Sequence, residues 1–231
     1  MNRAEQASRS ILDRVAEGTL RIGEELPSEA DLAAELEMSR LTIREAVKNL
    51  AARGVISVRH GKRNRLAPVE EWDLLNAELM ELRGRMRGEG RDLVEQLTEV
   101  RQIIEIGATE LAAQRISPAQ IDRMRAEIKA MAEAENAGPD IEAAVEADIR
   151  FHRVIVEAAA NEYLAAVYRP MEEVLRAVRR QTSAMAEVRA EALGWHIEIL
   201  EQLEQARGEG SRDAMRGHME QTMRAVREER A

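Results

Sequence analysis

The chain has 231 residues, which suits one large domain or two modest ones. It is rich in Ala, Leu, Glu and Arg, has only 2% aromatic residues and contains no cysteine, so disulfides and thiolate metal sites are excluded. No apolar run approaches membrane-spanning length, and the first ten residues lack the apolar core of a signal peptide. We therefore expect a mainly helical, cytoplasmic protein that does not contact a membrane.

The net charge of -9 is distributed unevenly. Residues 1–69 carry 12 Lys/Arg and 10 Asp/Glu, whereas the remainder carries 22 and 33. Within residues 40–65 there are eight basic residues and a single acid, Glu45. A local basic surface on an acidic protein fits DNA binding, because only the contacting face must meet phosphate. A solvated charged face would show the same pattern, and charge alone does not separate the two interpretations.

The first part of the chain reads as three helices and a hairpin. Residues 4–16 form the first helix, Ser28 opens a second with capping-box spacing to Asp31, and Ser39 caps a third that runs to about Arg53. The β-rich segments 55–59 and 63–66 can then pair as a hairpin across His60, Gly61 and Lys62. This order predicts a winged helix-turn-helix.

From residue 70 onward nearly everything has helical period. We expect helices near 73–86, 91–115, 118–135, 140–159, 161–182, 185–206 and 211–229, separated by Gly- and Pro-containing breaks. The natural outcome is an antiparallel all-α bundle of six or seven helices. The predicted organisation is therefore a DNA-binding domain over 1–69, a linker and first helix over 70–90, and an effector-binding and dimerisation domain over 91–231.

The third helix would enter the major groove by its N-terminal end. Arg40, Thr42 and Arg44 project outward there; arginine suits guanine edges, and threonine can contact a base or a thymine methyl. The Ser39 cap and the free backbone N–H groups beside it suit a phosphate. At the hairpin tip, His60, Gly61 and Lys62 would reach the DNA backbone or the minor groove.

The stretch LPSEADLAAELEMSRLTIREAVKNLAARGVISVRHGK resembles the N-terminal domain of the GntR family of bacterial regulators. The matching positions are Leu26, Pro27, Ser28, Glu29, Leu32, Ala33, Ser39, Arg40, Arg44, Glu45, Ala46, Leu50 and Gly54. The resemblance covers residues 8–67 and implies that Arg40, Thr42 and Arg44 face the operator, with Gly61 in the wing. Two departures are Ala30, where many relatives have a polar or basic residue, and a wing that reads Gly-Lys-Arg-Asn where many have Gly-x-Gly-Thr.

Three of the four histidines lie in the second part of the chain, and their spacing indicates a metal site. Asp148 precedes His152 by four residues, so both can face one atom from a single helix. His196 and His218 flank a turn expected at 208–210 and would come level in an antiparallel hairpin. Three imidazoles and a carboxylate suit zinc above all, with nickel and manganese as alternatives. The competing interpretation is that each histidine is an isolated surface residue.

Residues 92–226 also resemble the FCD domain of FadR-type GntR regulators. The family's ligands, an Asp, a His four residues later and two further His, fall on Asp148, His152, His196 and His218. In such relatives the metal lies at the floor of a cavity and helps to hold a carboxylate effector. Arg101 matches an arginine that commonly lines this cavity, although a surface ion pair is its alternative role.

Together these features predict a transcription regulator that binds double-stranded operator DNA as a homodimer. A small organic acid would act as effector, and the linker resembles that of sugar-acid-responsive members. We expect a repressor that its effector releases, with no enzymatic activity. Three alternatives remain: a regulator whose signal is the metal itself, a metal-dependent enzyme, and an interaction module with a vestigial helix-turn-helix.

Overall fold

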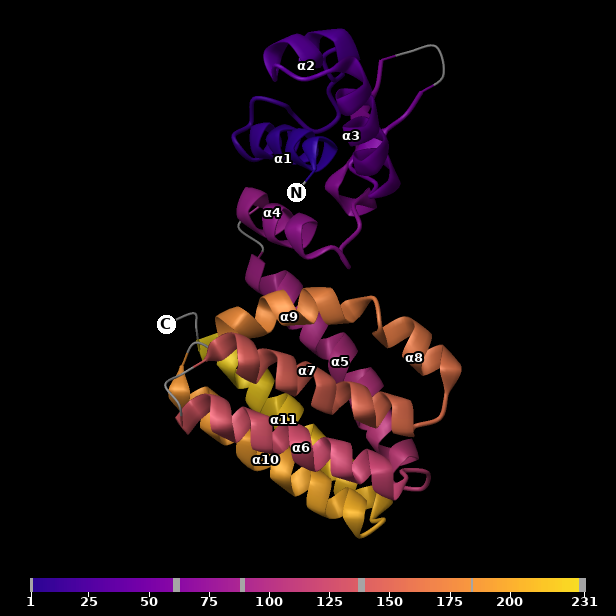
Figure 1. Cartoon of the computed structure of the whole chain (residues 1–231), viewed down its shortest axis with the longest axis vertical. Coiled ribbons are helices and arrows are strands. Elements are labelled where there is room, and N and C mark those ends of the chain that lie inside the picture. The colour runs from indigo at the N-terminus through magenta and orange to yellow at the C-terminus, as the bar shows by residue number, and fades with distance from the viewer. Residues whose placement is uncertain (1, 60–62, 88–89, 137–139, 184, 229–231) are drawn as a thin grey trace. The chain divides into compact units, whose positions relative to one another are not determined.

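A computed structural model describes residues 2–59, 63–87, 90–136, 140–183 and 185–228 (Figure 1). The chain divides into two compact units, Met1–Gly90 and Arg91–Ala231. Each unit has its own hydrophobic core. The mainly helical architecture predicted from the sequence is confirmed, and none of the described helices is long and apolar enough to cross a membrane.

The first unit contains a three-helix core followed by a short hairpin. Its helices are α1 (Arg3–Ala16), α2 (Glu29–Glu35) and α3 (Arg40–Ala52), with a 3-10 turn at Val69–Glu71 and α4 (Ala77–Arg87) at its end. Ser28 and Ser39 cap α2 and α3, because each side-chain oxygen accepts a hydrogen bond from the backbone N–H three residues later. These caps fix where the two helices of the helix-turn-helix begin.

The hairpin is shorter than the sequence indicated. Strand β1 (Ile56–Ser57) pairs antiparallel with β2 (Arg65–Leu66), with Ile56 opposite Leu66 and Ser57 opposite Arg65. Glu25 adds a bridge to Arg65 on the other edge. The predicted DNA contacts His60, Gly61 and Lys62 lie outside the described residues.

Residues 70–90 include side chains that complete the core of the first unit. Trp72, Leu79 and Leu82 are buried there with the apolar faces of α1 and α3. The indole N–H of Trp72 donates to the carbonyl oxygen of Ala67 at 3.2 Å. The segment after the hairpin is therefore anchored to this unit at Trp72 and again at Leu79 and Leu82 of α4.

The second unit is a bundle of seven helices among the described residues (Figure 1). They are α5 (Gly90–Ala112), α6 (Pro118–Asn136), α7 (Ile141–Ala158), α8 (Glu162–Tyr168), α9 (Met171–Thr182), α10 (Ala186–Glu204) and α11 (Gly208–Glu228). The helix pairs α6–α7 and α10–α11 pack along their lengths. The core of the unit lies between these pairs, and α7 is its most buried helix.

Two helix boundaries in this unit were predicted wrongly. The single helix expected over 161–182 is interrupted at Arg169 and Pro170, because proline has no N–H to continue the helical hydrogen bonds. The last helix begins at Gly208 rather than at residue 211, and the turn before it places Ala206 at a φ of 51°. Gly208 and Gly210 were assigned to a turn, but both lie in the first turn of α11.

Candidate metal centre and nucleic-acid interface

The N-terminal end of α3 presents an open, partly basic surface. Arg40, Leu41 and Arg44 are exposed, and Leu41 is 68% exposed despite its apolar side chain. The opposite face of α3 is fully used by the core, through Ile43, Ala46, Val47 and Leu50. An exposed apolar residue between two arginines at a helix start is suited to base edges and thymine methyl groups.

Ser39 and Thr42 are linked to each other at this end of α3. Their hydroxyl oxygens lie 2.8 Å apart, and the backbone N–H of Thr42 donates to the Ser39 hydroxyl at 3.1 Å. Thr42 is only partly exposed, unlike Arg40 and Arg44. The arginines are therefore the more accessible of the predicted DNA contacts.

The four predicted metal ligands come together in the second unit. Asp148 and His152 lie on α7, His196 on α10 and His218 on α11. One ligand atom from each residue lies within 4.8 Å of the others, and all three histidines are buried. Helical spacing brings the first two residues to one face, and packing of the α10–α11 pair supplies the other two.

The spacing of these atoms fits a tetrahedral divalent metal. Nε2 of His152 lies 3.3 Å from Nε2 of both His196 and His218, and Oδ1 of Asp148 lies 3.2 Å from Nε2 of His196. Ligands placed at zinc–nitrogen distances in a tetrahedron lie about 3.3 Å apart. Three ring nitrogens cannot all satisfy one another, since a neutral imidazole carries one N–H. A cation between them would satisfy every lone pair, so the donor set fits a metal.

Behind His152 lies a second buried carboxylate. Oε2 of Glu105 is 2.6 Å from Nδ1 of His152, while Oε1 accepts hydrogen bonds from Nε of Arg101 at 2.8 Å and from the Tyr168 hydroxyl at 3.0 Å. Burial alone would raise the pKa of Glu105, but Arg101 and His152 hold this pKa well below its usual range. Glu105 therefore stays ionised and orients His152.

Arg101 lines the cavity beside the metal cluster, but its guanidinium is already paired. Its side chain is 4% exposed, so its ion pair with Glu105 is a buried one and the surface pair considered from the sequence is wrong. Burial alone would lower the pKa of Arg101, but the Glu105 carboxylate raises it.

Asp148 is held by Arg179 of α9, a residue that sequence reasoning did not single out. Nη1 of Arg179 pairs with Oδ2 of Asp148, which leaves Oδ1 toward the histidines. Burial alone would raise the pKa of Asp148, but Arg179, His152 and His196 bring it well below its usual range. Burial lowers the pKa of His196 and, more strongly, that of His218. The site thus combines an ionised carboxylate at Asp148 with neutral imidazoles at His196 and His218, the forms in which these groups bind metals.

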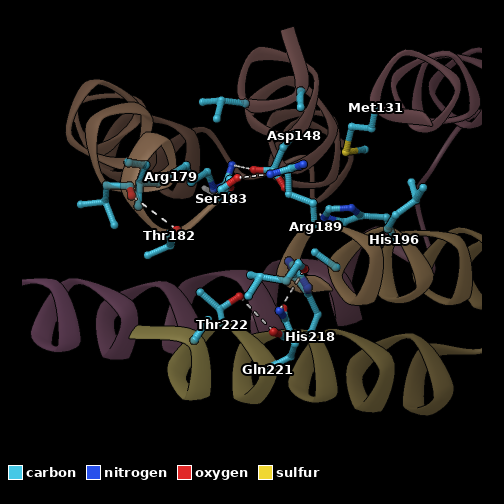
Figure 2. Close-up of a pocket in the computed structure, with 18 of the residues that line it drawn as sticks. Met131, Asp148, Arg179, Thr182, Ser183, Arg189, His196, His218, Gln221 and Thr222 are labelled. Atoms are coloured by element: carbon cyan, nitrogen blue, oxygen red, sulfur yellow. Dashed lines mark hydrogen bonds and ion pairs between the residues drawn. The ribbon is translucent and has the colours of Figure 1, made fainter. Parts of the chain in front are cut away.

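A cavity opens beside the cluster, lined by residues of α5, α6, α7, α9, α10 and α11 (Figure 2). Asp148, His196 and His218 form part of its wall, and Arg179 reaches Asp148 from α9. His152 does not line the cavity and is completely buried. Three of the four candidate ligands therefore face a space in which a small molecule can sit.

Glu105 and Arg179 carry a faint signal in the sequence. Arg179 and Arg180 are consecutive, and Arg179 follows Leu175 by four residues, which places it on the apolar face of α9. Glu105 follows Arg101 by four residues on a helix whose same face is apolar. A charge on an apolar stripe indicates a buried pair, but its partner is not visible from the sequence.

Comparison with known families identifies both units. Residues 3–65 match the gntR family of bacterial regulatory proteins, and residues 96–221 match the FCD domain. The HTH-type transcriptional regulator LutR of Bacillus subtilis is 31% identical over 168 residues, which cover 73% of each chain. The chain belongs to the GntR family. It is a DNA-binding transcription regulator with an FCD effector-binding domain.

Other relatives agree with this assignment. The galactonate operon transcriptional repressor of Escherichia coli is 26% identical to this GntR-family chain over 182 residues, covering 79% of it and 78% of the repressor. The structure of Lar, which controls the Listeria monocytogenes agr system, superimposes with a TM-score of 0.72 at 19% identity, covering 99% and 98% of the two chains. E. coli McbR/YncC gives 0.57 at 18% identity over the whole of both chains. These structural likenesses support the fold.

Proposed function

We propose that this GntR-family regulator is a homodimeric repressor that a small carboxylate releases from its operator. The observation that carries the proposal is the Asp148–His152–His196–His218 cluster beside a cavity, on the same chain as the exposed arginines of α3. A divalent metal, zinc by its ligand spacing, would polarise and hold a carboxylate oxygen. As a DNA-binding protein it would act in the bacterial cytoplasm.

On the DNA side, Arg40 and Arg44 are the residues that we expect to read the operator. Both are exposed at the start of α3, where a recognition helix meets the major groove. Ser39 and Thr42 would contribute phosphate or base contacts, and the hairpin tip, with His60, Gly61 and Lys62, would contact the backbone or minor groove. Each good bidentate arginine–guanine pair discriminates against a wrong base by about 1–3 kcal/mol.

A second copy of the chain fits an exposed apolar face of α5. Ile103 is 79% exposed and Val100 43%, with the small Gly107 one turn further on. Apolar side chains on one helical face indicate a protein interface, and a pseudo-palindromic operator requires two recognition helices. Ile103→Glu is expected to give a monomer in sedimentation, while Ile197→Glu, at an exposed apolar position on α10, is expected to leave the dimer intact. A monomeric wild-type chain would overturn the dimer.

The DNA assignment is tested by selecting DNA from a random-sequence library with the full-length chain. The wild type is expected to enrich a pseudo-palindrome, and Arg40→Ala with Arg44→Ala is expected to abolish that enrichment. Lys48→Ala is the matched control, because Lys48 lies later on α3 and is exposed beside Glu45. Unchanged enrichment by the double variant would reject α3 as the reading helix.

The effector assignment is tested with the selected DNA and zinc-loaded protein. A panel of small carboxylates is titrated at constant zinc, and at least one is expected to lower DNA affinity. Asp148→Asn is expected to abolish that response while leaving effector-free DNA binding in place. A response to zinc alone, with none to any carboxylate, would identify a metal-responsive regulator instead.

A further inference from the structure

The threonines around the cavity direct their hydroxyl protons into their own helices. Thr98, Thr182 and Thr222 each donate to the carbonyl oxygen four residues earlier, at 2.8, 3.4 and 3.1 Å. A hydroxyl has one proton to donate, so only its lone pairs remain for a ligand. These three residues look polar in the sequence but offer a ligand no donor.

Other polar side chains of the cavity are paired with protein groups. The side-chain amide of Gln221 donates to the carbonyl oxygen of Val188 at 3.3 Å. Arg189 and Glu135 bind each other, with Nη2 of Arg189 3.1 Å from Oε2 of Glu135, and Arg189 also donates to the Ser183 carbonyl at 2.6 Å. A ligand hydroxyl placed here would have to compete for partners that are already engaged.

Between these paired groups the wall of the cavity is aliphatic. Leu97, Val145, Leu175, Val178 and Leu193 reach it from α5, α7, α9 and α10. Methyl and methylene groups of a ligand would be buried favourably against them. Hydroxyl groups at the same places would lose their hydrogen bonds to water without replacing them.

Arg179 is a buried cationic group of the cavity that retains free donor capacity. The side chain of Arg179 is 7% exposed, its Nη1 pairs with Asp148, and its Nη2 has no hydrogen-bond partner among the described residues. Arg101, by contrast, directs its Nε and Nη2 to Glu105. Arg179 therefore presents a buried, unsatisfied donor next to the metal cluster, which is the geometry that a carboxylate satisfies.

We propose that the effector is an amphipathic monocarboxylate: Arg179 binds its carboxylate beside the metal cluster, and an aliphatic body with few hydroxyls fills the rest of the cavity. This inference rests on the proposed function of a carboxylate-responsive regulator. It makes a polyhydroxylated sugar acid a poor ligand, because such an acid would bury several hydroxyls against aliphatic side chains and paired polar groups. Arg179 becomes the residue that selects for the anion.

Hexanoate and gluconate test the inference directly, since both are six-carbon monocarboxylates and differ in five hydroxyl groups. Titration calorimetry of the zinc-loaded full-length chain is expected to give a Kd for hexanoate at least about tenfold lower than for gluconate. Equal binding, or tighter binding of gluconate, would overturn the inference while leaving a carboxylate-responsive regulator. Binding of neither acid, with no response of DNA affinity to any carboxylate, would overturn both.

The role of Arg179 is tested against its neighbour. Arg180 is 47% exposed and pairs with Glu142 at the surface, so Arg180→Met is the matched control for Arg179→Met. Arg179→Met is expected to weaken hexanoate binding by about tenfold or more, and Arg180→Met to leave it unchanged. Zinc content of each variant, measured by mass spectrometry, shows that the cluster persists.

Arg179→Lys covers the case in which Arg179→Met does not fold, because it keeps the charge opposite Asp148 but loses the planar fork. It is expected to fold, to retain zinc and to bind hexanoate with an affinity several-fold below wild type. If a folded, zinc-containing Arg179 variant bound hexanoate with wild-type affinity, Arg179 would not be the residue that binds the carboxylate.

Discussion

Oε2 of Glu105 on α5 lies 2.6 Å from Nδ1 of His152 on α7. A proton on Nδ1 would face this carboxylate, and the Nε2 lone pair would then face Asp148, His196 and His218. Glu105 in turn is held by Arg101 and Tyr168. Buried polar contacts from α5 and α8 therefore converge on His152 of α7, one of the ligands of the candidate metal centre.

Glu105→Gln is expected to weaken zinc binding by about tenfold to a hundredfold, because an amide orients His152 without supplying negative charge. Competition with a chromophoric chelator measures the change. Glu110→Gln is the control on the same helix, since Glu110 lies at the surface and is 3.7 Å from Arg212. Equal zinc affinity in the two variants would show that Glu105 has no part in the metal centre.

Removal of the metal is expected to lower the thermal stability of the protein. Without a cation, three buried ring nitrogens face one another unsatisfied, with Nε2 of His152 3.3 Å from Nε2 of both His196 and His218. A ligand present at a hundred times its Kd stabilises a fold by about 2.7 kcal/mol. Calorimetry should therefore show a lower Tm in EDTA that Zn²⁺ restores and Ca²⁺ does not, since Ca²⁺ prefers oxygen ligands. Full recovery with Ca²⁺ would argue against a nitrogen-rich site.

The metal-free protein is expected to lose stability as the pH falls below about 6.5. Burial lowers the folded-state pKa of His196 and His218, so the unfolded chain binds more protons than the folded one between the folded and unfolded pKa values. The two histidines contribute their full stabilisation above the pKa that they have in the unfolded chain. As the pH falls below that pKa, the free energy of unfolding decreases by up to about 1.4 kcal/mol per pH unit for each histidine. The pKa values of Asp148 and Glu105 are also lowered, so these carboxylates change the stability only at more acidic pH.

Urea denaturation in EDTA at pH 7.5 and pH 5.5 measures this loss. His218→Gln serves as the control, because it removes one of the two titrating groups and should flatten the pH dependence. A wild-type protein that is equally stable at both values, or more stable at pH 5.5, would contradict the burial of neutral imidazoles.

The four residues that the sequence singled out as metal ligands do come together in the structure, but the residues that hold them were not predicted. The i, i+4 spacing of Asp148 and His152 is a property of any helix, so it survives errors in helix boundaries. The pairing of His196 with His218 survives too, although the turn lies at 205–207 rather than 208–210, because His196 lies 9 residues before the observed turn and His218 11 residues after it, which is again nearly equidistant. Helix periodicity and a short helical hairpin therefore account for each pair of ligands, while the packing of α7 against α10 and α11 brings the two pairs together.

Glu105, Tyr168 and Arg179 were not predictable in the same way. Their roles arise where α5, α8 and α9 meet α7, and α8 was expected to be continuous with α9. Acidic and basic residues are common on helices, and only packing decides which of them are buried in pairs. The start of α3, by contrast, was predicted well because its signal is a cap: Ser39 accepts the N–H of Thr42 wherever the helix packs.

Gly54, which follows the recognition helix, tests the close packing at its C-terminal end. It has a φ of +75°, and a Cβ added to it would lie 2.1 Å from the carbonyl oxygen of Glu71. Gly18 has the same φ, but nothing lies within 4 Å of an added Cβ. Alanine at Gly18 therefore suffers only the left-handed backbone strain of about 1–2 kcal/mol. Alanine at Gly54 suffers that strain and a backbone clash, so Gly54→Ala is expected to lose more free energy of unfolding than Gly18→Ala, by about 2 kcal/mol or more.

Urea denaturation of the two variants measures this difference. The result also bears on DNA binding, since β1 starts two residues after Gly54 and a displaced hairpin would shift the wing relative to α3. Equal losses in the two variants would mean that the segment at Glu71 yields freely, and that α3 and the hairpin are not locked together at this glycine.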